Sequence, residues 1–357
     1  MAKVPEPEPR VGPAWTPFLL GHEAAEARFT GLLERNRLPH AWLLSGTQGV
    51  GKATLAYRMA RLLLAAEAER VRVQDPEHPL FRQVAAGAHP DLKVIDEPLD
   101  PKTGKLKSSV PVDLVRLRME EMYATSMAGG RRVMLIDPDV DLGANSANAL
   151  LKLLEEPPAG AYLIIMAQHY SPLPVTIASR CARLRLRPLA AAQVTDGLLR
   201  LQPELGPARA AQLAELARGS IGRALELHAI DWPGAYGRLL DSMGKRPVPV
   251  VDIAEQLLKL AGSQGVLGAG RLLGDYVHRA ARFAATGTRP GELVPDEAKR
   301  LRALPGVASL DRCALLWEKL AAATRRADAL NLEPLQTLIG LVDGLVSSAP
   351  RRSPAGT

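Results

Sequence analysis

A glycine-rich stretch near the start of the chain has the residue types and spacing of a phosphate-binding loop. The sequence GTQGVGK holds Gly46, Gly49, Gly51 and Lys52 between an apolar strand pattern and a helical pattern. In such a loop, backbone N–H groups at the helix N-terminus bind phosphate oxygens, and the lysine reaches the terminal phosphates. The alternative is a glycine-rich turn with a fortuitous lysine, which the flanking strand and helix disfavour.

The residue after the lysine departs from the pattern of an active nucleotide site. A Ser or Thr hydroxyl at that position normally coordinates Mg²⁺, and here the residue is Ala53. Thr54 lies about 100° further around the helix, which makes it a poor substitute. We therefore expect a weak or vestigial site for ATP or ADP. Thr54 would lie at the edge of this site.

A second acidic position follows an apolar strand pattern. VMLIDPDVDL places Asp137 where a Walker-B aspartate stands in an ATPase, but the glutamate that commonly follows and polarises the attacking water is replaced by Pro138. Asp139 and Asp141 come later, and the chain would have to turn for them to serve. The alternative role for Asp137 is to cap the next turn. The hydroxyl that binds the metal and the glutamate that polarises water are therefore both missing. Because these groups position the reactants and stabilise charge, we expect very slow hydrolysis.

The composition narrows the class of protein. Of the 357 residues, 47% are hydrophobic and 23% charged, which is typical of folded globular chains. A net charge of +7 suits a polyanion or an acidic partner without requiring nucleic acid. Two cysteines are too few for a disulfide scaffold or a four-cysteine zinc site, and they favour a cytoplasmic location. No uninterrupted apolar run of about 18 residues occurs, so we expect no membrane contact.

The first half of the chain alternates strand and helix patterns. Strands are expected at 41–45, 91–96, 131–137, 161–167 and 182–189, and helices at about 52–66, 112–125 and 146–155. This alternation predicts an α/β fold with a parallel sheet covered on both faces. After Pro188 only helical periodicity remains, with a break marked by proline and glycine at IDWPGAYG and GKRPVP.

The composition shifts predict four segments. They are a disordered N-terminal tail at 1–17, an α/β P-loop domain at 18–188, a small helical lid domain at 189–235 and a helical domain at 236–350. The polar stretch from Asp96 to Ser109 is expected to form a loop. Its lysines, from Lys102 to Lys107, form a solvated face or touch DNA.

The segment from Ser146 to Cys181 closely resembles one family. NALLKLLEEPP, the apolar strand after it and PVTIASRC are similar to the clamp-loader subunits of bacterial DNA polymerase III, delta-prime and gamma/tau, which are AAA+ proteins. The resemblance extends through the phosphate-binding loop, HPDLKVID and GGRRVMLID, and covers roughly residues 18–230. It implies an AAA+ P-loop domain, a helical lid and an all-α C-terminal collar domain that holds subunits together.

The resemblance also implies site residues. Arg180 of the SRC motif matches an arginine that reaches the γ-phosphate held by a neighbouring subunit, an arginine finger in trans, and a guanidinium suits that task. The alternative is a surface arginine beside a buried cysteine. Arg223 in GSIGRALEL matches the sensor-2 arginine, which faces nucleotide or packs the lid. The polar sensor after the fourth strand is Gln168 or His169. Zinc-bearing relatives carry four cysteines that this chain lacks, so no zinc is expected.

The combination of a damaged site and an intact SRC motif resembles the delta-prime subunit, as does the absence of a C-terminal extension beyond the helical domain. The implied role is a largely non-hydrolysing stator of a heteropentamer with gamma/tau and delta subunits, which places the sliding clamp on primed DNA. It would be a non-catalytic part of a DNA-directed DNA polymerase holoenzyme. The alternative is a gamma/tau-like motor or another AAA+ ATPase. A stand-alone P-loop kinase would have no use for the finger or the collar.

Overall fold

The computed structural model describes residues 12–96, 111–128, 130–137, 144–168, 173–286, 293–302, 310–330 and 332–347. The chain divides into two compact units: the first runs to Leu205 and includes Arg218–Arg223, and the second comprises Gly206–Ala217 and the chain from Ala224 onward. The segment from Lys102 to Lys107 lies outside the described residues, as do Pro138, Asp139, Asp141 and His169.

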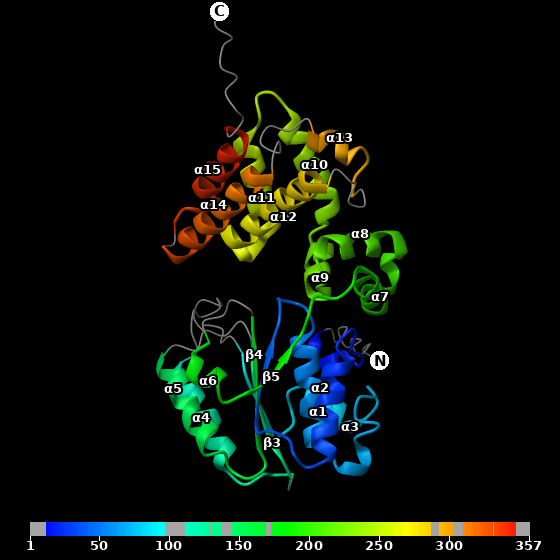
Figure 1. Ribbon diagram of the computed structural model, residues 1–357, viewed down its shortest axis with the longest axis vertical. Helices are drawn as coiled ribbons and strands as arrows, with labels where there is room; N and C mark the ends of the chain where they lie inside the picture. Colours follow the sequence, from blue (N-terminus) through cyan, green and yellow to red (C-terminus); the bar gives the residue numbers. More distant parts are fainter. Residues whose placement is uncertain are drawn as a thin grey trace, which may run out of the picture. The chain divides into compact units, whose positions relative to one another are not determined.

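The first unit is built around a five-stranded parallel sheet (Figure 1). In spatial order the strands are β2 (Leu92–Ile95), β3 (Arg132–Ile136), β4 (Ala161–Ala167), β1 (Ala41–Ser45) and β5 (Ala182–Arg185). Every neighbouring pair is parallel. The predicted parallel α/β sheet is confirmed.

Helices cover both faces of this sheet (Figure 1). On one side lie α1 (Glu23–Glu34), α2 (Lys52–Leu64) and α3 (Pro79–Ala85), and on the other lie α4 (Val112–Tyr123), α5 (Ala144–Glu155) and α6 (Val175–Ala178). The alternation of side chains along a strand divides the core in two. In β1, Trp42 and Leu44 pack with α2, while Ala41 and Leu43 pack with α4 and α5. Burial on both faces explains why the strands are apolar throughout.

The N-terminal segment is ordered further toward the start of the chain than expected. Pro13–Trp15 form a 3-10 helix, η1. Trp15 meets the ring of Phe81 edge-on at 6.5 Å, and the Ala14 carbonyl accepts a hydrogen bond of 2.9 Å from Arg61. The prediction of a disordered tail through residue 17 is therefore wrong for residues 12–17, because these contacts tie the segment to α2 and α3.

After β5 the first unit continues with α7 (Ala191–Leu201) and the 3-10 helix η3 (Pro203–Leu205). The fifth strand is shorter than predicted. Leu186 still donates to the Ser45 carbonyl at 2.7 Å, but the N–H of Leu189 turns away and donates to Gly219. Pro188 lies between them and has no N–H to continue a ladder. A 3-10 turn, η2 (Glu67–Glu69), follows α2.

The second unit is helical in its described residues. Its helices are α8 (Pro207–Ala217), α9 (Ile221–Ala229, which begins in the first unit), α10 (Trp232–Gly244), α11 (Val250–Ala261), η4 (Gly262–Gln264), α12 (Gly265–Thr286), α13 (Glu297–Arg302), α14 (Leu310–Ala329) and α15 (Pro334–Ser347). Helices α11, α12, α14 and α15 pack against one another. The proposed lid at 189–235 spans both units, and its boundaries stay a prediction. Among the described residues, no helix has the length and apolar character to cross a membrane.

Helix α10 corrects the predicted break at IDWPGAYG. Pro233 stands in the first turn, where a missing N–H costs no helical hydrogen bond. Gly234 leaves room for the Asp231 carboxylate, which a Cβ at that position would overlap. Trp232 and Tyr236 are fully buried and anchor the helix. Proline and glycine here begin a helix rather than interrupt one.

A buried ion pair joins three helices of the second unit. Arg279 of α12 contacts both carboxylate oxygens of Glu297 at 2.6 Å. The Tyr236 hydroxyl donates to the same carboxylate at 2.8 Å, and the Leu293 N–H donates at 2.9 Å. The two charged side chains are 4% and 2% exposed. Such a pair tolerates burial only because its hydrogen bonds are satisfied.

Removal of one partner of this ion pair should make the protein less stable to unfolding. Glu297→Ala leaves the Arg279 charge buried and unpaired, so we expect the free energy of unfolding to fall by about 3 kcal/mol or more. The control is Asp241→Ala, which removes an exposed partner of Arg300 and should cost about 1 kcal/mol or less. Denaturant unfolding of both variants measures this. If both variants lost the same small amount of unfolding free energy, burial of the Arg279–Glu297 pair would not make its integrity important for stability.

Candidate nucleotide site and exposed arginine

The predicted phosphate-binding loop lies in the context that it requires. It follows β1 and opens α2, with Lys52 as the first residue of the helix and Gly51 as its N-cap. Gly51 and Gly49 have φ values of 113° and 69°, which favour glycine. The structure thus brings together the four loop residues that the sequence singled out.

Lys52 is turned toward its own loop. Its ammonium group donates hydrogen bonds to the carbonyls of Gly46 at 3.0 Å and Thr47 at 2.8 Å. The residue is only 3% exposed. The lysine therefore fixes the shape of the loop that it would use to bind a terminal phosphate.

The start of α9 packs directly on the same loop. The Ser220 hydroxyl donates to the Gln48 carbonyl at 2.8 Å, and the Gly222 N–H donates to the Gly49 carbonyl at 3.0 Å. The Ser220 hydroxyl also accepts from the Arg223 N–H at 3.0 Å, as a helix N-cap does. A Cβ on Gly222 would lie 2.7 Å from the Gly49 Cα. The Gly-Ser pair before this helix is the local signal for a helix start, but no local pattern indicates its partner in the loop.

His22 completes the set of contacts to the loop. Its Nε2 lies 2.9 Å from the Val50 carbonyl, and a carbonyl only accepts, so this nitrogen carries the proton. Burial lowers the pKa of His22 below its ordinary value of 6.5, which favours the neutral ring. Together these contacts engage all five carbonyls from Gly46 to Val50, which we call the loop carbonyls.

The metal-binding side of the site is incomplete. Ala53 packs its methyl group against the core between α2 and the sheet, so the position after the lysine offers no oxygen ligand. Thr54 is half-buried on the next position of α2. Within the described part of the chain, no group of three or more His, Cys, Asp or Glu residues could hold a metal ion.

Asp137 follows β3, as predicted for a Walker-B position. It is half-buried, and its N–H donates to the Ile95 carbonyl at 2.9 Å. Burial raises the pKa of Tyr57 on α2, and the negative charges of Asp137 and Asp96 raise it further. The Asp137 carboxylate is therefore close enough to Tyr57 on α2 to act on it electrostatically. Gln168 follows β4 and is half-buried.

Arg180 is exposed, while its neighbour in the SRC motif is buried. The side chain of Arg180 is 40% exposed. Its Nη1 donates to the Thr176 carbonyl at 3.0 Å, and its Nη2 lies 2.8 Å from Glu155 Oε1. Cys181 packs inward, and burial raises its pKa to about 11, so it stays a thiol. The motif thus anchors a cysteine in the core and presents an arginine to solvent.

Arg180 and the loop lie at opposite ends of two neighbouring strands. β1 and β5 are parallel, with Trp42 opposite Ala182 and Ser45 opposite Arg185. The loop follows the end of β1, whereas Arg180 precedes the start of β5. The paired strands therefore separate them by a distance on the order of 10 Å. This places the arginine away from the phosphates that its own loop would hold.

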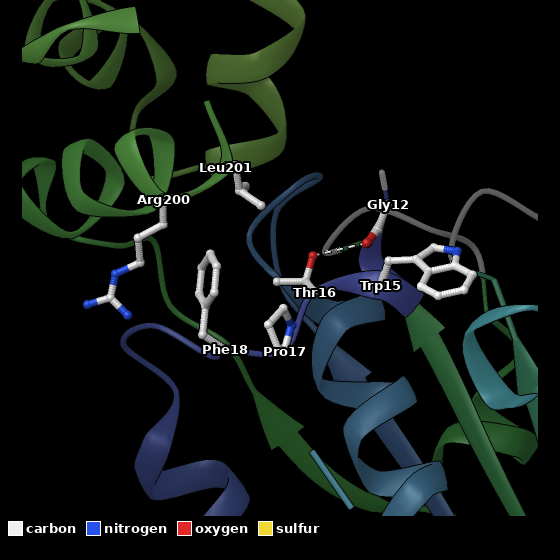
Figure 2. A pocket seen from close by; sticks show the side chains of 7 residues that line it. All are labelled: Gly12, Trp15, Thr16, Pro17, Phe18, Arg200 and Leu201. Carbon is white, nitrogen blue, oxygen red and sulfur yellow. Dashed lines mark hydrogen bonds between the residues drawn. The ribbon is translucent and has the colours of Figure 1, made fainter. Parts of the chain in front are cut away.

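A pocket of about 430 Å³ lies beside the N-terminal segment of the first unit (Figure 2). It is lined by Gly12, Trp15, Thr16, Pro17, Phe18, Arg200 and Leu201. Figure 2 shows Arg200 on one side, and its guanidinium carbon is 5.4 Å from the Phe18 ring centroid. No residue of the phosphate-binding loop lines this pocket, so it does not belong to the predicted site.

The parallel sheet and the glycine loop between β1 and α2 define an α/β fold of the P-loop type, and a helical region follows it. Residues 21–190 match the model of the family described as DNA polymerase III, delta subunit. Residues 21–190 are therefore similar to subunits of DNA polymerase III, and the resemblance seen in the sequence is confirmed for this region.

Individual relatives agree with this assignment. A DNA polymerase III subunit delta-prime of Pseudomonas aeruginosa is 34% identical over 203 residues, which are 57% of this chain and 60% of that protein. A subunit tau/gamma of Haemophilus influenzae is 32% identical over 214 residues, 58% of this chain and 30% of that protein. The matches to the delta-prime relatives thus span about half of their length.

Among solved structures, a gamma subunit-related protein of Thermotoga maritima is similar with a TM-score of 0.44 and 14% identity. The similarity covers 90% of this chain and 99% of that one. It is too distant to bear on function.

The contact between Gly49 and Gly222 allows a direct test of the packing of α9 on the phosphate-binding loop. In an unhindered helix Ala is favoured over Gly by about 1 kcal/mol, but the Cβ of Gly222→Ala would meet the loop backbone. We expect this variant to lower the free energy of unfolding by about 1–3 kcal/mol and to speed amide exchange at residues 46–50. The control is Gly31→Ala in α1, where a Cβ meets nothing within 4 Å and should stabilise. Stabilisation by both substitutions would contradict the contact.

Proposed function

We propose that this chain is a delta-prime subunit of a clamp loader, a largely non-hydrolysing stator. It supplies Arg180 to the nucleotide site of a neighbouring subunit and helps to load the sliding clamp onto primed DNA. Its partners are gamma/tau and delta subunits in a heteropentamer. The observation that carries the proposal is the position of Arg180: it is exposed, and it precedes the start of β5, whereas the chain's own loop follows the end of β1.

The chemistry of arginine supports the role in trans. A guanidinium is permanently charged and carries five N–H donors, so it bridges phosphate oxygens and stabilises the charge that develops on them. Arg180 precedes the start of β5, whereas the chain's own loop follows the end of the neighbouring strand β1. This placement supports the proposal that the phosphate it serves belongs to another subunit. The buried thiol of Cys181 holds the arginine at a fixed place on the surface.

The state of the loop supports the stator over the motor. Ala53 supplies no metal ligand, and the Lys52 ammonium donates to the carbonyls of Gly46 and Thr47 rather than pointing away from the loop. ATP or ADP would be held only weakly, through loop N–H groups and Lys52 after local rearrangement. Arg223 belongs to the start of α9, which packs on the loop, and in this proposal it faces the nucleotide or packs the lid. No zinc takes part in the proposal.

The alternative is a gamma/tau-like motor or another AAA+ ATPase, and the correct placement of Lys52 and the glycines favours it. The two functions make different predictions for the isolated chain. We expect phosphate release far below about 1 s⁻¹, the lower end of ordinary enzyme turnover. Steady-state phosphate assays measure this. A rate of about 1 s⁻¹ or more that Lys52→Ala abolishes would establish the motor instead.

The trans arginine is tested in the reconstituted complex. Arg180→Ala should slow ATP hydrolysis by about 10³-fold at the site that it serves, because a trans arginine stabilises the transition state by that order. The matched control is Arg183→Ala, since Arg183 is a nearby exposed arginine that donates only to the Ala178 carbonyl among its described contacts. Thermal melting should be nearly unchanged for both. If both variants hydrolyse ATP at the rate of the unsubstituted complex, Arg180 is not the finger.

A further inference from the structure

We infer that Glu155 is a positioning residue that aims the guanidinium of Arg180 at the phosphate of the neighbouring subunit. This inference rests on the proposed function of Arg180. Glu155 belongs to the LLEEPP motif, and the role above uses none of that motif's acidic residues. The structure brings the two residues together from positions 25 apart in the chain.

Two anchors hold the guanidinium from two different elements. Glu155, the last residue of α5, contacts Nη2 at 2.8 Å. The carbonyl of Thr176 in α6 accepts from Nη1 at 3.0 Å. Anchoring both terminal nitrogens fixes the plane of the group as well as its place. A planar donor whose direction is set in advance loses less side-chain freedom when it meets a phosphate.

The fold itself gains little from this pair. Both side chains are exposed, 40% for Arg180 and 51% for Glu155, and exposed ion pairs add little stability. The last turn of a helix also carries partial negative charge, so a carboxylate there is unfavourable for α5. Stability therefore does not account for an acidic residue at this position, whereas orientation of Arg180 does.

The anchors leave the arginine able to act. A guanidinium has five N–H donors, and the carboxylate and the carbonyl use one on each terminal nitrogen. Nη1 also lies 3.5 Å from the Ser179 hydroxyl, so the donors that remain for phosphate oxygens of a neighbouring subunit are on Nη2 and Nε. Glu155 thus holds the group without covering it.

The next residue provides a matched comparison. Glu156 has the same charge and is exposed, and its carbonyl accepts from the Tyr123 hydroxyl at 3.2 Å. None of the hydrogen bonds of Arg180 within the described residues goes to the Glu156 carboxylate. Loss of charge at Glu156 changes the local field by a similar amount without releasing the guanidinium.

The experiment measures ATP hydrolysis by the reconstituted clamp loader with Glu155→Ala, Glu155→Gln, Glu156→Gln and Arg180→Ala. A misplaced catalytic group loses rate steeply, so we expect Glu155→Ala to lower kcat about 10-fold with KM for ATP unchanged. Glu155→Gln keeps an oxygen acceptor of the same shape and should restore most of the rate. Glu156→Gln should match the unsubstituted complex, and all four variants should melt at nearly the same temperature.

The results separate this inference from the proposed function. If Arg180→Ala slows hydrolysis while Glu155→Ala matches Glu156→Gln, the finger stands and the role of Glu155 is overturned. A faster rate for Glu155→Ala also overturns it, since the carboxylate would then restrain the arginine. If Arg180→Ala itself has no effect, the proposed function fails, and the inference fails with it.

Discussion

The structure of the first unit depends on the backbone of its phosphate-binding loop, where three segments converge on five successive carbonyls. Lys52 reaches back to two of them, the start of α9 takes two more, and His22 takes the fifth. These contacts join the chain before α1, the helix after β1 and a segment some 170 residues further on. The glycines and the lysine are therefore required for packing, even where the chemistry of hydrolysis lacks its metal ligand.

This arrangement places the phosphate-binding loop and the exposed Arg180 in different parts of the first unit. The loop carbonyls after β1 accept hydrogen bonds from the protein itself, while Arg180, which precedes β5, is exposed to solvent. Between them runs a parallel sheet buried on both faces, with β3 fully buried. Close-packed interiors deform little. The buried Cys181 next to Arg180 therefore helps to keep the exposed arginine at a constant position.

Much of the fold followed from sequence patterns. Short apolar runs separated by helical periodicity gave the five parallel strands, and GTQGVGK was placed correctly between a strand and a helix. Pro233 and Gly234 resemble a break in the sequence, but the backbone forms a helix there, and the burial of Trp232 and Tyr236 anchors it. The contacts of Ser220 and His22 with the loop, like that of Glu155 with Arg180, join residues distant in sequence. No local pattern encodes such pairs.

The central claim is that this chain assists hydrolysis in a neighbour rather than in its own loop. Cryo-electron microscopy of the reconstituted clamp loader with Mg²⁺ and a non-hydrolysable ATP analogue tests it most directly. The predicted result is an analogue in the adjacent subunit whose γ-phosphate contacts Arg180, with no Mg²⁺-bound analogue at residues 46–52 of this chain. A Mg²⁺-bound analogue seated on Lys52, with Arg180 contacting no nucleotide, would contradict it.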